Sequence, residues 1–191
     1  MKDFIMNKAM EKLSAEISEY RLGHTLRVAF LCVELARLYG VDENSAQIAG
    51  LLHDNAKDMS IEEMSKYAEK KGKPLSEDEL KYPAVLHSPL GALRAKYEYG
   101  VDDEDILNAI SSHTTGRVGM SDLEKILFIA DMTEAGRTFE GVEELRILSR
   151  ESLDEALLAC LKRSIGFVME KKQTLWEDSA RVWNWALGNI R

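Results

Sequence analysis

The sequence predicts an all-α protein, and three observations support that prediction. Only three prolines occur in 191 residues. Apolar residues recur at steps of three and four, as in amphipathic helices, and no alternating segment is long enough to predict a strand. Four Ser-x-x-Glu patterns can satisfy the free backbone N–H groups at a helix start, and they lie at Ser60/Glu63, Ser76/Glu79, Ser121/Glu124 and Ser152/Glu155.

The N-terminal third of the chain predicts three helices. Apolar positions from 5 to 20 indicate the first, and the second is expected to start near His24 and to end at Gly40, which suits a left-handed C-cap. Asp42 can cap the third helix. That helix is expected to carry the apolar run that ends in the pair His53-Asp54.

Further helices are expected along the rest of the chain. Ser88-Pro89 indicates the N-cap and first position of a helix that runs to about Tyr99. Others are expected at 103–113, 121–132, 142–150 and 153–172, and a last one from near Asp178. The chain shows no repeat and no interdomain linker, so a single domain over residues 1–191 is expected.

The composition is that of a soluble globular protein, with 45% hydrophobic and 30% charged residues. A formal net charge of −8 excludes the basic footprint that binds duplex nucleic acid. An anionic substrate would therefore have to be held by local lysines, arginines or a metal ion, and not by the field of the whole molecule.

Several features predict a cytoplasmic protein without a membrane partner. Cys32 and Cys160 belong to no Cys-x-x-Cys pattern and are expected to be buried thiols. Residues 1–10 lack the apolar region of a signal peptide. No apolar run approaches the ~18 residues that a membrane span needs.

The residues with the most distinctive chemistry are the four histidines and two aspartates. His24, His53, His87 and His113 are the only histidines. Asp54 follows His53 directly, and Asp131 follows two leucines at four-residue steps, on an apolar stripe. A carboxylate buried on such a stripe without a partner costs several kcal/mol or more, so Asp131 is expected to have a partner.

The order H…HD…D over these positions resembles the HD superfamily of metal-dependent phosphohydrolases. The segment 110–116, Ile-Ser-Ser-His-Thr-Thr-Gly, and the stretch from Asp131 to Arg137 are similar to the YqeK branch. The resemblance implies an HD-domain helical bundle, with a metal-binding core at about 20–137 and C-terminal helices at 142–190. It also implies symmetrical hydrolysis of diadenosine tetraphosphate to two ADP.

The matched motif positions, and hence the expected metal ligands, are His24, His53, Asp54 and Asp131. Imidazole and carboxylate together suit Mn, Fe, Co, Ni or Zn better than Mg or Ca, and the resemblance implies iron. Two histidines and two aspartates leave positions open for water and phosphate, as in a catalytic site. In some HD proteins extra histidines hold a second metal bridged by the aspartate, but one metal is favoured here because no further carboxylate is evident.

The remaining motif residues are expected to contact the substrate. Asp54, His87 and His113 are assigned catalytic roles. Arginine suits bidentate phosphate binding and lysine suits neutralisation as a point charge. The full set expected to bind the dinucleoside polyphosphate or an ADP-like nucleotide is Arg21, His24, Lys57, His87, His113, Thr114, Arg137 and Thr174.

The sequence departs from the family pattern at two places. The segment 132–137, Met-Thr-Glu-Ala-Gly-Arg, lacks the proline that usually precedes the arginine, which leaves the rigidity of this loop open. Lys172-Gln173 precedes Thr174 where a His-Pro segment is usual. Trp183 is expected in the core, and Trp176 or Trp185 is available to stack on adenine or to contact a second subunit.

Other interpretations stay open at this point. The enzyme could hydrolyse a nucleoside monophosphate or triphosphate, or the protein could be a non-catalytic nucleotide sensor. It could also be a helical scaffold in which the histidines only fill the core. The family resemblance further implies a homodimer.

Overall fold

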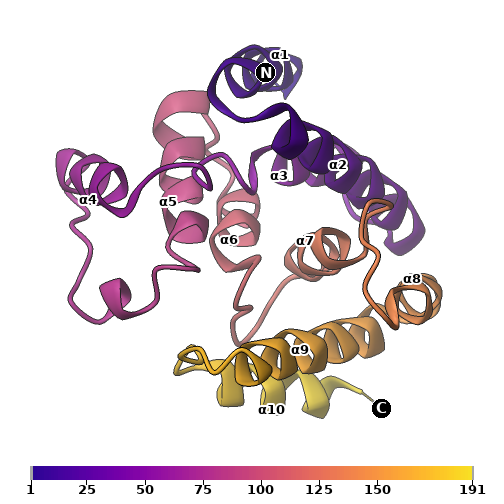
Figure 1. Cartoon of the computed structure of the whole chain (residues 1–191). Helices are drawn as coiled ribbons and strands as arrows, with labels where there is room; N and C mark the ends of the chain where they lie inside the picture. Colours follow the sequence, from indigo (N-terminus) through magenta and orange to yellow (C-terminus); the bar gives the residue numbers. More distant parts are fainter. Residues whose placement is uncertain (1, 191) are drawn as a thin grey trace.

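The computed structural model describes residues 2–190, which form ten α-helices and no strand (Figure 1). This confirms the predicted all-α class. The helices are α1 (Lys2–Glu16), α2 (Glu19–Tyr39), α3 (Glu43–Leu52), α4 (Ile61–Lys70), α5 (His87–Arg94), α6 (Glu104–Ser112), α7 (Asp122–Thr133), α8 (Val142–Glu151), α9 (Leu153–Glu170) and α10 (Ser179–Asn189). A short 3₁₀ helix, η1 (Glu79–Lys81), precedes α5, and a π-helical turn, η2 (Ala95–Tyr99), extends it.

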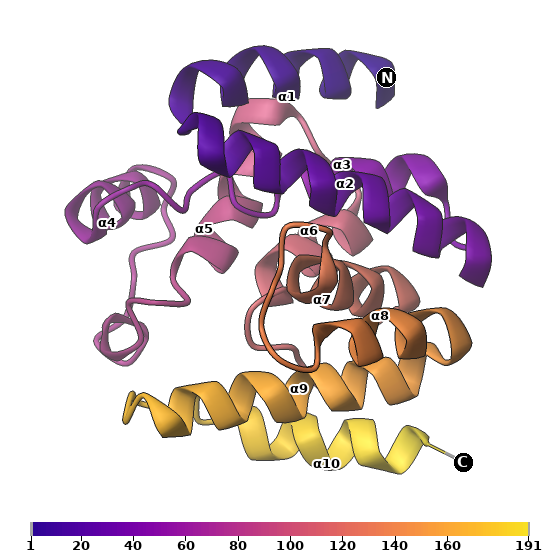
Figure 2. The same ribbon diagram turned by 45° about the vertical axis from the view of Figure 1, so that its right-hand side comes forward.

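The helices pack in three levels around one main core. Helix α1 lies across one end, the pair α9 and α10 lies along the opposite end, and α2, α3, α6 and α7 lie between them (Figures 1 and 2). Helix α4 and η1 stand at the periphery, and α4 shares a smaller apolar cluster with α5. The central helices bury long aliphatic side chains almost completely, so the segments that carry the histidines are backed by a packed core.

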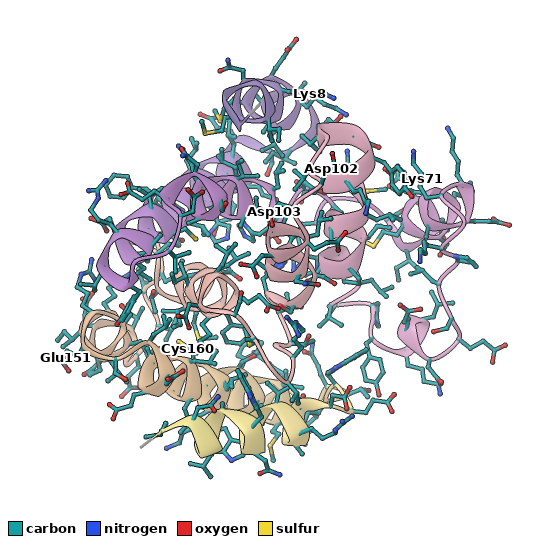
Figure 3. The ribbon with its side chains drawn as sticks, turned by 180° about the vertical axis from the view of Figure 1, so that it is seen from behind. Lys8, Lys71, Asp102, Asp103, Glu151 and Cys160 are labelled. Atoms are coloured by element: carbon teal, nitrogen blue, oxygen red, sulfur yellow. The ribbon has the colours of Figure 1, made fainter. Side chains whose placement is uncertain are left out.

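Most of the predicted helix ends are confirmed. Gly40 caps α2 with φ 72°, and Asp42 accepts a hydrogen bond from the Ser45 amide at the start of α3. Reciprocal Ser–Glu capping bonds begin α4 and α7. Asp103, labelled in Figure 3, caps α6.

Two predicted helix starts were wrong. The pattern at Ser76/Glu79 forms both of its bonds but begins only η1, because Pro83 cannot continue a helix and restricts Tyr82 before it. Helix α5 begins at His87 and not after Ser88. The Ser88 hydroxyl is bonded to the Thr114 hydroxyl at 2.8 Å, so it caps no helix.

The boundaries near the motif residues also differ from the prediction. The first helix ends at Glu16, and Ser18 caps a second helix that begins at Glu19. The spacing of apolar residues continues across this break, so the sequence pattern predicts one uninterrupted helix as far as Tyr20. That residue, which is part of the pattern, is in fact 80% exposed. Helix α3 ends at Leu52, so the His53-Asp54 pair lies just beyond it and not within it, with His53 still at helical backbone angles.

Helices α2 and α3 approach each other unusually closely. A Cβ atom at Gly50 would lie 2.6 Å from Cα of Ala29, well inside van der Waals contact. Only glycine permits this approach. Because Gly50 lies just before His53 and Ala29 just after His24, the contact draws both histidines to one place.

Both cysteines are free and buried, as predicted. Cys160 lies on α9 beneath α7 (Figure 3), and burial raises the pKa of its thiol to about 12. Trp183 and Trp185 both pack partly buried against the main core. No helix within residues 2–190 is long and apolar enough to cross a membrane.

Candidate metal centre and substrate cavity

The motif residues converge from separate parts of the chain on one buried cluster. Helix α2 supplies His24, the turn after α3 supplies His53 and Asp54, and α7 supplies Asp131. The first residue of α5 is His87, and His113 directly follows α6. All four histidines are at most 6% exposed.

The first group that could hold a metal ion consists of His24, His53 and Asp131, whose nearest ligand atoms lie within 4.8 Å of one another. Asp131 Oδ1 is 3.1 Å from His24 Nε2 and 3.9 Å from His53 Nε2. An ion with bonds of ~2 Å can lie between atoms at such separations. The spacing required by the expected ligand set is therefore present.

Asp54 lies between this group and the other two histidines. Its Oδ2 is 3.6 Å from His53 Nε2 and 4.0 Å from His24 Nε2. Its Oδ1 is 3.3 Å from His87 Nε2 and 3.6 Å from His113 Nε2. His53, Asp54 and His113 form a second group with metal-ligand spacing, so Asp54 faces both groups.

The histidine rings are oriented from their Nδ1 side. His53 donates to the Gly50 carbonyl at 2.7 Å and His113 to the Ile110 carbonyl at 2.8 Å, each three residues earlier. His87 Nδ1 is 3.1 Å from the Ala84 carbonyl. Because a carbonyl can only accept, these bonds place the proton on Nδ1 and leave the Nε2 lone pair directed into the cluster.

Five buried side-chain atoms of the described residues have no hydrogen-bond partner, and one of them, on His53, lies inside the cluster. Nε2 of His53 is inaccessible to solvent and has no hydrogen-bond partner among the described residues, although buried polar groups nearly always have one. Two imidazoles and two carboxylates around such an atom are a donor set that fits a divalent transition metal. The residues present therefore fit the ion that the motif implies.

The electrostatics of the cluster favour neutral imidazoles at His53 and His87 and charged carboxylates, whereas at His24 the hydrogen bonds to Asp131 and Glu134 outweigh burial and raise the pKa. Burial lowers the pKa of His53, and burial together with His113 and Lys57 lowers the pKa of His87 to about 2. Burial alone would raise the pKa of Asp54 and Asp131, but the surrounding histidines outweigh it and both values are lowered. For His53, Asp54 and Asp131 these are the protonation states of metal ligands.

Three cations border the cluster, as expected from the sequence. Arg21 Nη1 lies 2.7 Å from Asp54 Oδ2, and Arg137 Nη2 lies 2.7 Å from Asp131 Oδ1. Lys57 Nζ lies 3.0 Å from His87 Nε2. The two arginines are thus not free surface charges: each is paired with one of the two central carboxylates.

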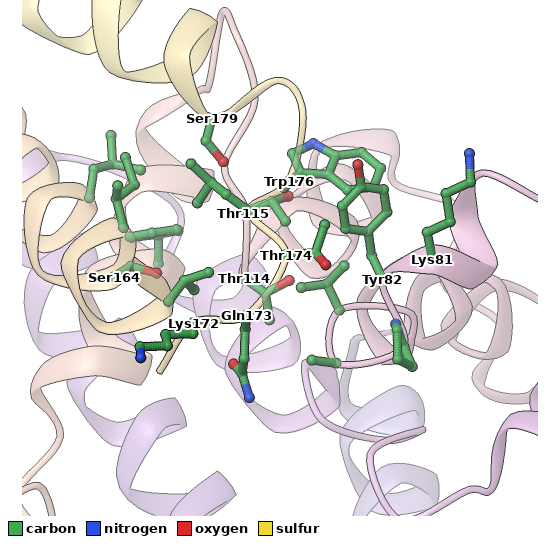
Figure 4. Close-up of a pocket in the computed structure, with 18 residues that line it drawn as sticks. Lys81, Tyr82, Thr114, Thr115, Ser164, Lys172, Gln173, Thr174, Trp176 and Ser179 are labelled. Carbon is green, nitrogen blue, oxygen red and sulfur yellow. The ribbon is translucent and has the colours of Figure 1, made fainter. Parts of the chain in front are cut away.

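Thr174 is the one predicted residue that lies apart from the cluster. It lines a neighbouring cavity of about 360 Å³ together with Thr114, which follows His113 (Figure 4). Phe128, one turn before Asp131 on α7, lies in the same wall. Tyr82 and Trp176 meet edge to face across the cavity rim, with their ring centroids 4.9 Å apart. The cavity therefore adjoins the cluster through Thr114 and α7.

Two features of this site were missed from the sequence. The buried carboxylate of Glu134 lies 3.1 Å from Nδ1 of His24, and only its position three residues after Asp131 could have suggested a contact. Arg94 donates to the carbonyl of Asn55, directly after the His-Asp pair, and is paired with Glu16 and Glu98. No sequence pattern indicates the contacts of Arg94 with Asn55 and Glu16.

Comparison with known proteins gives a consistent result. The HD domain family matches residues 21–136. Proteins called symmetrical bis(5'-nucleosyl)-tetraphosphatase from Halalkalibacterium halodurans and Bacillus subtilis are 37% and 38% identical, each over 93% of this chain and 94% and 95% of their own length. A solved structure from Clostridium acetobutylicum, described as a predicted HD superfamily hydrolase involved in NAD metabolism, superposes with a TM-score of 0.91 at 39% identity, covering 96% of this chain and 97% of that one.

Proposed function

The chain belongs to the HD-domain family, and on this basis we propose that it is a metal-dependent phosphohydrolase that cleaves diadenosine tetraphosphate symmetrically into two ADP. The relatives that carry this activity in their names align over almost the whole chain. The observation that carries the proposal is the convergence of two imidazoles and two carboxylates around the unpartnered Nε2 of His53.

His24, His53, Asp54 and Asp131 would hold the ion. When bound, a divalent transition metal lowers the pKa of water and withdraws charge from a phosphoryl oxygen, the two things that hydrolysis of a phosphoanhydride needs. Iron is the proposed metal, with Mn, Co, Ni and Zn compatible with the same donors. We favour a single ion, because the two groups share His53. Two metals per chain on elemental analysis would contradict that choice.

Arg21, Lys57 and Arg137 would bind the polyphosphate. Each lies at a ligand carboxylate or histidine and can exchange that partner for a phosphate oxygen as the substrate enters. The neutral state of His87, whose pKa burial lowers to about 2, leaves its Nε2 lone pair as an acceptor, so it would orient a phosphate through a bridging water molecule. His113 lies beside it, with 3.2 Å between the two Nε2 atoms.

The cavity beside the cluster would hold one adenosine of the substrate. Its volume of about 360 Å³ is of the right order for a small ligand, and its walls combine apolar side chains with a few hydroxyls. Thr114 would contact the phosphate end and Thr174 the nucleoside end (Figure 4). The rings of Tyr82 and Trp176 are placed to contact the base.

The test is product identification with anaerobically purified protein whose metal content has been measured. Diadenosine tetraphosphate should give ADP as the only nucleotide product, and rates on nucleoside monophosphates and on a deoxynucleoside triphosphate panel should be much lower. The variant His53→Ala should lose both metal and activity. Formation of ATP and AMP, or the absence of any ADP, would contradict the proposed reaction.

We also propose a homodimer formed through the outer face of α2 and α8. Leu26, Phe30 and Ile147 are exposed there, Phe30 to 69% and Ile147 to 60%. Leu26 and Phe30 border a cavity of about 330 Å³ on this face, which Arg27, Arg146 and Arg150 also line. Sedimentation should give a dimer for the unchanged protein and a monomer for Phe30→Asp, and a monomer in both cases would contradict this proposal.

A further inference from the structure

His24 differs from the other three histidines in what holds its Nδ1 atom. The rings of His53, His87 and His113 each lie against a neutral backbone carbonyl three residues earlier in the chain. His24 instead lies against the carboxylate of Glu134, at 3.1 Å from Oε1, and this partner is 110 residues away. Glu134 is 2% exposed.

The carboxylate of Glu134 is itself fixed from several sides. Its Oε2 accepts from Arg27 Nε and from the backbone N–H of Gly136, both at 2.5 Å. Arg27 lies on α2, one turn after His24. The other oxygen, Oε1, accepts a longer bond from Arg27 Nη2 at 3.4 Å and faces the imidazole of His24.

The loop that carries Glu134 is fastened from helix α8. The guanidinium of Arg146 donates to three backbone carbonyls of this loop: that of Thr133 at 2.9 Å, that of Glu134 at 2.7 Å and that of Arg137 at 2.8 Å. These bonds supply the rigidity that the missing proline left in doubt. The position of Glu134 is thus set independently of His24.

We propose that Glu134 is a positioning residue that accepts the Nδ1 proton of His24 and so keeps Nε2 of that ring free for the metal. The inference rests on the proposed metal centre. His24 Nε2 also faces Asp131 Oδ1 at 3.1 Å. Without Glu134, the neutral ring could carry its proton on Nε2 and donate it to Asp131, and Nε2 would then not be free for the metal. A carboxylate behind a ligating histidine fixes both the tautomer and the ring orientation.

The experiment uses the full chain loaded with Zn²⁺, which is diamagnetic. Chelator competition measures zinc affinity, and proton NMR of ¹⁵N-histidine-labelled protein follows the Nδ1–H resonances. In Glu134→Ala, the His24 Nδ1–H signal should move or exchange away, and zinc affinity should fall roughly 10- to 100-fold. The signals of His53 and His113, held by backbone carbonyls, should stay in place as internal references.

Two further variants separate positioning from general stability. Glu134→Gln keeps an oxygen that can accept from Nδ1, and it should therefore retain the His24 signal and recover most of the zinc affinity. Glu124→Ala is a matched control, because Glu124 is equally buried and is held by Arg117 and Ser112, but contacts no histidine ring. It should lower thermal stability and leave zinc affinity and the His24 signal unchanged.

The outcomes separate failure of this inference from failure of the proposed function. Unchanged zinc affinity together with an unchanged His24 signal in folded Glu134→Ala overturns the positioning role. Equal losses of zinc affinity in Glu134→Ala and Glu124→Ala also overturn it, because they indicate a general effect on folding. An unchanged protein that binds no divalent metal at all overturns the proposed metal centre instead.

Discussion

The ligand cluster and the cavity beside it are built in different ways. In the cluster every histidine is buried, each ring is held at Nδ1, and the helices that carry the rings pack on the main core. The cavity is lined by α7 and α9 and also by two loops, 81–85 and 172–176, in which Lys172, Gln173 and Thr174 are exposed. The difference teaches that the proposed metal centre is organised without a ligand, whereas the proposed nucleoside site has exposed loop residues that can adapt to one.

Removal of the metal should have the largest effect on turnover, and it should leave the cavity unchanged. Chelated protein and His53→Ala are both expected to lose at least about 100-fold in turnover, because the ion contributes several kcal/mol to transition-state stabilisation. Chromatographic measurement of ADP release checks this. Added metal should restore the chelated protein but not the variant. Retention of more than about a tenth of the rate after chelation would show that the cluster is not the reacting centre.

The packing that supports the cluster should be intolerant of one methyl group. Gly50→Ala should destabilise the fold by about 1–3 kcal/mol, because the new Cβ meets the Ala29 backbone and cannot be accommodated without movement of α2. Denaturant unfolding measures the change. Gly166→Ala on α9 is the matched control, since that position has open space, and it should be neutral or stabilising by up to about 1 kcal/mol. Equal effects at the two sites would contradict the close contact.

A change at the cavity should alter binding and spare the metal. Trp176→Ala should raise KM for diadenosine tetraphosphate roughly tenfold, since an aromatic contact with a base contributes about 1–3 kcal/mol, while metal content stays at the unchanged level. Steady-state kinetics and elemental analysis check both. Trp185→Ala, which removes a tryptophan packed on the core away from the cavity, should lower stability without raising KM. A lower metal content in Trp176→Ala would show that the cavity and the cluster are not independent of each other.

The smallest expected effect is a pH dependence of stability that originates in the cluster. In metal-free protein the pKa of His53 is lowered by burial and that of His87 lies at about 2, against 6.5 in the unfolded chain. Below about pH 6.5 these two rings therefore bind protons in the unfolded chain but not in the folded chain, and their contribution to stability falls as pH falls, by at most about 1.4 kcal/mol per pH unit for each ring. His24, whose pKa is raised, contributes with the opposite sign. Urea unfolding at several pH values measures the slope, and His87→Gln should reduce it.

Local chemistry explains why much of the fold could be predicted from the sequence. The caps at Asp42, Ser60 and Ser121 are short-range devices that a few consecutive residues define, and the structure confirms them. The boundary at Ser18 was missed because the apolar stripe continues through it. The π-helical turn after α5 was also missed, because a change in hydrogen-bond register leaves the apolar periodicity almost intact.

The candidate site could be predicted only where the motif itself names the residue. His24, His53, Asp54 and Asp131 come together as expected, although their roles as ligands remain predictions. The contact of Glu134 with His24 and that of Trp176 with Tyr82 join segments far apart in sequence. Glu134 offers only its position three residues after Asp131, and Trp176 offers no spacing signal, so the packing of whole helices is needed to reveal both contacts.

The side chain of Arg94 joins the end of α1 to the turn that follows α3. Through Glu16 and Asn55, this one guanidinium links the last residue of α1 to the turn that follows the His-Asp pair. A truncated chain without its first sixteen residues would lack Glu16, so Arg94 would lose one of its two acidic partners. This loss would occur next to Asn55, which directly follows the His-Asp pair. Helix α1 therefore helps to hold the turn that follows the His-Asp pair, although it contributes no residue to the cluster. A shortened protein without α1 is expected to hold this turn less firmly.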